Sequence, residues 1–71
     1  STYPQRKALF EEQRSHMEAE LEQMNRTLDM LKFKCWYYEQ AIHDGSENRL
    51  KELIPDHLPD GIRKAYENAH S

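Results

Sequence analysis

The sequence predicts an all-α fold, in which one long helix is followed by one or two short helices that fold back on it. Three observations lead to this prediction. A stretch of about forty residues contains neither glycine nor proline. Its apolar residues recur at helical spacing, and a segment with several turn-forming residues follows it. We therefore divide the chain into a long helical region, residues 1–45, and a short helical tail, residues 46–71.

The long helix is predicted over Gln5–Asp44, a stretch rich in Glu, Gln, Leu, Met, Arg and Lys, which favour helices. Pro4 suits the first turn, with Ser1 or Thr2 as the cap before it. Gly45 can adopt the left-handed conformation that commonly ends a helix. Such a helix spans roughly 60 Å, whereas a compact chain of this length has a radius of gyration of about 11 Å. The helix is therefore too long to be covered by its own chain.

The apolar residues of the long helix form a heptad repeat sustained over about five heptads. Because a long helix with one apolar side needs a partner, this side is predicted to be an interface between two copies of the chain. We call it the a/d seam, after the heptad positions of its members. The a/d seam consists of Phe10, Met17, Leu21, Met24, Leu28, Leu31, Cys35, Tyr38 and Ile42.

Two charged residues at position a indicate how the two copies lie. In a parallel dimer Lys7 and Arg14 would each face the same residue of the other copy, which would place like charges in the seam. In an antiparallel dimer, each a residue meets a d residue. One antiparallel register pairs Leu21 with Leu31 and lays the stem of Arg14 along the ring of Tyr38. The sequence therefore predicts an antiparallel homodimer.

A second apolar stripe lies away from the a/d seam, at heptad positions b, c and f. This second stripe consists of Met30, Phe33, Trp36 and Tyr37. A helix that is apolar on two sides must pack against two partners, and the tail is the natural second one.

The tail is predicted to contain a helix that Ser46 caps and that runs to Leu53, where Pro55 stops it. The segment Leu58–Gly61 is typical of a turn or a helix start, and a last helix is expected over Ile62–Ala69. Together these helices should cover the side that carries Trp36. The apolar side of the tail consists of Leu50, Leu53, Ile54, Leu58, Ile62 and Tyr66.

The composition excludes several classes of function. A chain of 71 residues, of which 37% are hydrophobic, can bury little core and cannot wall off an enzyme pocket. Its net charge of −3 disfavours direct binding to nucleic acid. No apolar run approaches the roughly 20 residues of a membrane span, and a single cysteine cannot form an internal disulfide. We expect a non-enzymatic, cytoplasmic protein, and the start at Ser1 rather than Met predicts a piece of a longer chain.

The segment LEQMNRTLDMLKFKCWYYEQAI, Leu21–Ile42, resembles the C-terminal linker helix of bacterial MerR-family transcription regulators. In that family a leucine-rich heptad precedes a lysine and an aromatic run that ends in glutamate, and Lys32–Glu39 matches this run. The tail after Gly45 matches only loosely. The resemblance implies an antiparallel coiled-coil homodimer, and a separate winged helix-turn-helix domain, absent from this chain, that binds promoter DNA. A stand-alone coiled-coil adaptor is the alternative.

Some side chains could have more than a structural role. Four aromatic side chains and one carboxylate could bind a hydrophobic cation, as in some drug-sensing members of the MerR family, or could simply form a core. Cys35 is either a small buried hydrophobe of the seam or a reactive thiol. The four histidines lack metal-ligand spacing, and no catalytic constellation is visible. We therefore expect no metal, cofactor or catalytic residue. The candidate effector-binding residues are Phe33, Trp36, Tyr37, Glu39 and Tyr66.

Overall fold

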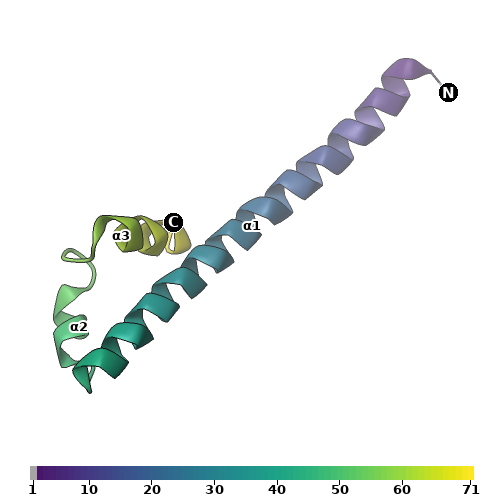
Figure 1. Cartoon of the computed structure of the whole chain (residues 1–71). Coiled ribbons are helices and arrows are strands. Elements are labelled where there is room, and N and C mark those ends of the chain that lie inside the picture. The colour runs from purple at the N-terminus through teal and green to yellow at the C-terminus, as the bar shows by residue number, and fades with distance from the viewer. Residues whose placement is uncertain (1) are drawn as a thin grey trace.

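The computed structural model describes residues 2–71, and within them it contains three helices and no strand (Figure 1). They are α1 (Tyr3–Asp44), α2 (Asn48–Leu53) and α3 (Asp60–Ala69). The prediction of an all-α fold with one long helix and short ones after it is confirmed. The described chain measures 64 × 20 × 14 Å, with a radius of gyration of 19.1 Å. It is therefore a rod with a small folded end, because a compact chain would have a radius near 11 Å.

Helix α1 begins at Tyr3, two residues before the predicted start at Gln5. Thr2 is extended and precedes the first turn, and its backbone N–H donates to the Oε1 atom of Gln5 at 3.1 Å. Pro4 occupies the first turn, where a missing N–H costs nothing. The predicted first residue of the helix is Gln5. It instead lies within the first turn, where its side chain helps to cap the helix. Ser1, the other predicted cap, lies outside the described residues.

The other end of α1 is the predicted glycine cap. Gly45 has a φ of 74°, and its N–H donates to the carbonyl of Ala41 at 2.9 Å. This left-handed conformation turns the chain sharply away from the helix axis. Arg49 then fixes the turn, because its Nε donates to the Asp44 carboxylate at 2.7 Å and an Nη donates to Oε1 of Gln40 at 3.2 Å.

Helix α2 begins at Asn48, so the prediction that Ser46 caps it is wrong. Glu47 occupies the cap position, and its side chain makes no capping hydrogen bond. The Glu47 carboxylate is engaged elsewhere, because it accepts a hydrogen bond from the Tyr37 hydroxyl across the turn at 2.7 Å. Helix α2 ends at Leu53, as predicted.

Helix α3 begins at Asp60, two residues before Ile62 and within the segment Leu58–Gly61 that is predicted to be a turn or a helix start. Pro59 precedes the first turn, and an acidic residue there is favourable beside the free N–H groups of a helix start. The Asp60 carboxylate also lies 3.3 Å from the Arg63 guanidinium.

A small core lies between the C-terminal half of α1 and the tail. Figure 1 shows α3 turned back toward the middle of α1, and the two helices are in contact. Leu50 is completely buried, and the remaining buried apolar residues are Phe33, Leu58 and Ala65. Of the other residues on the predicted apolar side of the tail, four are half-buried: Leu53, Ile54, Ile62 and Tyr66.

Candidate dimerisation surface

The a/d seam lies uncovered along α1 in the single chain. The exposed fractions of its large apolar side chains run from 50% at Leu28 to 83% at Ile42. Cys35 is exposed as well, with a free thiol. A row of exposed apolar side chains of this length is uncommon on a monomer and is typical of an interaction surface.

The opposite side of the same turns is covered. Phe33 is only 9% exposed, whereas Leu31, two residues away on the seam side, is 54% exposed. Heptad positions b, c and f lie across the helix from positions a and d, so the tail covers one side and leaves the other free. The C-terminal half of α1 thus has two apolar faces, only one of which is covered by its own chain.

Four aromatic residues join α1 to α3 on the covered side. The rings of Phe33 and Tyr66 lie 5.0 Å apart between centroids, at an angle of 60°. Trp36 and Tyr37 lie 6.3 and 6.0 Å from Phe33 in tilted arrangements. Such geometries are favourable aromatic contacts. The structure therefore brings together four of the five predicted effector-binding residues, as a packed cluster with Phe33 at its centre.

The carboxylate beside this cluster is Glu47, and sequence reasoning missed it. The hydrogen bond from Tyr37 to Glu47 raises the pKa of the Tyr37 hydroxyl above its ordinary value. Glu39, the predicted carboxylate, is exposed at heptad position e, on another side of α1. At the neighbouring turn, the hydrogen bond from Arg49 lowers the pKa of the Asp44 carboxyl.

The two charged residues at position a have acidic neighbours on their own helix. Lys7 Nζ lies 3.6 Å from the Glu11 carboxylate, and Arg14 Nε lies 3.3 Å from the Glu18 carboxylate. All four side chains are largely exposed, and such pairs contribute at most about 1 kcal/mol. The first part of the seam is therefore a mixed surface, polar at position a and apolar at position d.

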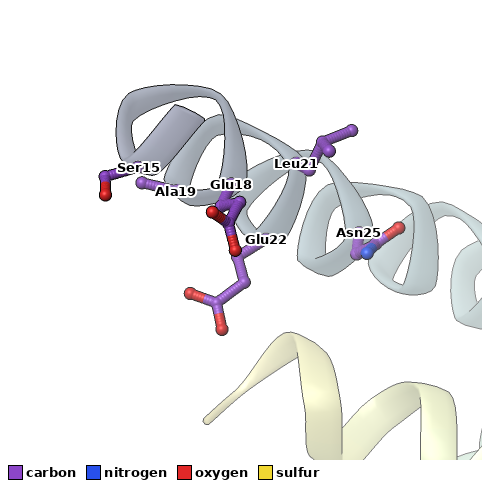
Figure 2. A pocket seen from close by; sticks show the side chains of 6 residues that line it. All are labelled: Ser15, Glu18, Ala19, Leu21, Glu22 and Asn25. Atoms are coloured by element: carbon purple, nitrogen blue, oxygen red, sulfur yellow. The ribbon is translucent and has the colours of Figure 1, made fainter. Parts of the chain in front are cut away.

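A shallow concavity on α1 offers no enclosed ligand site. It is lined by Ser15, Glu18, Ala19, Leu21, Glu22 and Asn25. Figure 2 shows Glu18 and Glu22 projecting on one side of the helix and Leu21 on another. Because every lining residue comes from one helix, no second wall surrounds a bound molecule, as a typical binding pocket requires.

Sequence reasoning also missed Arg49 and Ala65. Arg49 carries no signal in the sequence, because its two partners, Asp44 and Gln40, come within reach only once the chain turns at Gly45. Ala65 is 7% exposed and is the buried residue of α3. Its side chain adds little to an apolar pattern, although a small residue is what lets two helices approach closely.

Two further findings limit the chemistry of the surface. Within residues 2–71, no group of three or more His, Cys, Asp or Glu side chains is placed to hold a metal ion. No helix in that part of the chain has the length and apolar character needed to cross a membrane.

No protein-family model matches the chain, and no curated protein or solved structure is significantly similar to it. The resemblance to MerR-family regulators therefore stays a prediction from the sequence.

Proposed function

We propose that this chain is the dimerisation domain of a MerR-family DNA-binding transcription regulator. The observation that supports this proposal best is the uncovered a/d seam, whose large apolar side chains are all at least 50% exposed. Association with a second copy removes this surface from water, and apolar burial is the main driving force of such association. The resemblance of Leu21–Ile42 to the family's linker helix supplies the regulatory context.

The proposed dimer is antiparallel. In the register that pairs Leu21 with Leu31, Ile42 meets Phe10 of the other copy, so an apolar residue at one end of α1 is covered by the opposite end of its partner. The same register brings Glu18 toward Lys32. The N-terminal part of each α1, which has no tail beside it, then lies along the uncovered side of its partner's C-terminal half.

Within a regulator of this family, the proposed role is mechanical. A rigid two-fold pair of long helices holds two DNA-binding heads at a fixed spacing, and the half-site geometry of an operator follows this symmetry. A signal that changes the packing of the pair then changes the shape of the bound promoter DNA.

Disulfide crosslinking tests the seam and its direction together. Phe10→Cys and Ile42→Cys are made in a Cys35→Ser background, and the two proteins are mixed under mild oxidation. We expect efficient bonding between the two variants, since the antiparallel register places these positions opposite each other. Glu12→Cys, on the far side of the helix, is the control partner for Ile42→Cys and should bond poorly. Preferential bonding of each seam variant to its own kind would refute the antiparallel arrangement.

The sequence immediately before Ser1 separates the regulator from a stand-alone coiled-coil adaptor. A helix-turn-helix pattern there supports the regulator, and its absence supports the adaptor. Both functions use the same a/d seam, so this observation does not affect the proposed dimer.

Effector sensing is a second candidate, favoured by the carboxylate of Glu47 at the edge of the aromatic cluster. Phe33 is buried beneath Tyr66, so a hydrophobic cation would have to displace the ring of Tyr66 to reach it. Thermal-shift measurements with hydrophobic cations and aldehydes, together with Trp36 fluorescence, test this function. No response to any of them would leave the structural role alone.

A further inference from the structure

Helix α1 carries two apolar faces, but only one of them is available to another molecule. The a/d seam is exposed, and the second stripe lies under the tail. Within the second stripe Phe33 is buried, and its other members, Met30, Trp36 and Tyr37, are half-buried.

Helix α3 packs on the second stripe. Tyr66 packs on Phe33, and Ala65 is buried. Beyond them, the Asn68 side-chain amide donates to the carboxylate of Asp29. These contacts come from one ten-residue helix, which is too short to be stable by itself in water.

We propose that α3 is an intramolecular cover that keeps the second stripe from pairing with the second stripe of another copy, so that assembly stops at the dimer. A rod with two self-complementary apolar faces can add a copy on each side, so that assembly can continue beyond the dimer. With one face covered, a single self-complementary seam remains, and it closes after two copies. The proposed dimerisation function identifies the remaining seam, but the covering of the second stripe does not depend on it.

The cover competes well with another copy because it belongs to the same chain. A segment joined by a short connection acts at an effective concentration in the millimolar range. Gly45 and the Arg49 contacts with Asp44 and Gln40 direct the tail back along α1. Another copy of the protein, at micromolar concentration, does not displace the tail unless the contacts of α3 are weakened.

Ala65→Glu tests this proposal, because it places a charge at the buried position of α3. Lys64→Glu, at the adjacent exposed position, introduces the same side chain and is the matched control. Tyr66→Ser is a second, uncharged variant that removes the ring over Phe33. Trp36 emission reports the release of the cover, and sedimentation equilibrium reports the mass of the assembly.

We expect Ala65→Glu and Tyr66→Ser to shift Trp36 emission to longer wavelength and to form species of at least about twice the wild-type mass. Lys64→Glu should keep the wild-type mass and emission. Adding Phe33→Glu to Ala65→Glu should restore the wild-type mass, because it places a charge in the uncovered second stripe.

Two results would overturn the proposal. The first is a released cover, seen as shifted Trp36 emission, without any increase in mass. The second is unchanged Trp36 emission in both variants, because α3 would then not be held at these positions. A wild-type chain that is monomeric, with variants that nevertheless assemble, would refute the dimerisation function and leave the cover supported.

Discussion

The two halves of α1 have similar helix-forming composition and yet differ in how far the rest of the chain covers them. In the N-terminal half, every residue from 2 to 25 is exposed. In the C-terminal half, the tail packs on one side and buries Phe33. An isolated helix gains little stability from propensity alone. The C-terminal half is thus stabilised by contacts within its own chain, whereas residues 2–25 gain no such burial.

Leu28→Lys should produce the largest change, because it places a charge in the middle of the a/d seam. We expect dimer affinity to fall by more than roughly 100-fold, since an unpaired buried charge costs several kcal/mol. The N-terminal half should also lose helix, which circular dichroism measures alongside sedimentation. Ala19→Lys, at an exposed position on the other side, is the control. A dimer that survives Leu28→Lys unchanged would remove the proposed seam.

Phe33→Ala should mainly affect the C-terminal half of α1, which the tail covers. Truncating this buried ring should lower the free energy of unfolding by about 3–5 kcal/mol. Trp36→Ala should cost less, because Trp36 is only half-buried. Urea unfolding measures both losses. An equal or larger loss for Trp36→Ala would show that Phe33 is not the centre of the covered side.

Substituting the two glycines tests the turn that ends α1 and directs the tail back along it. Gly45→Ala should lower the free energy of unfolding by about 1 kcal/mol, because φ at this position is 74°. Gly61→Ala lies within α3, where a Cβ meets nothing within 4 Å, and should raise it by about 0.5 kcal/mol. Thermal unfolding measures both changes. Effects of the same sign would contradict the assigned cap.

The smallest expected effect concerns pH. Because Arg49 lowers the pKa of Asp44 in the folded chain, this carboxylate stabilises the fold above the ordinary aspartate pKa of about 4. The contribution disappears as the pH falls through the lowered value. Asp44→Asn should therefore lower the stability slightly at neutral pH, and the difference from the wild-type chain should vanish at acid pH, so that the acid side of the stability–pH curve becomes slightly flatter. Asp56→Asn, at an exposed turn residue, is the control.

The long helix and its glycine end could be predicted because both depend on local chemistry. An unbroken run of good helix formers sets the body of α1, and Gly45 supplies the left-handed conformation that ends it. The start of α2 could not be predicted in the same way. Glu47 takes the cap position from Ser46 while bonding to Tyr37, ten positions earlier in the chain, and a contact at that separation leaves no local pattern.

The aromatic cluster was predictable as a group, but its charged neighbour was not. Phe33, Trp36 and Tyr37 share a side of one helix, so their spacing places them together. Glu47 joins them only because the chain reverses after Gly45. The spacing of apolar residues does not predict the direction that the chain takes after such a turn. Whether the exposed seam binds a second copy, and whether the cluster binds an effector, stay predictions.

The reversal at Gly45 also decides where the chain's last residues emerge. Ala69 and Ser71 lie beside Gln23 and Met30, near the midpoint of α1, while the N-terminus is at its far tip (Figure 1). In the antiparallel pair proposed above, the two carboxyl ends would therefore both lie near the middle of the rod, whereas the two amino ends would lie at its opposite tips. Fluorophores on the carboxyl ends should thus exchange energy efficiently, whereas fluorophores on the amino ends should not.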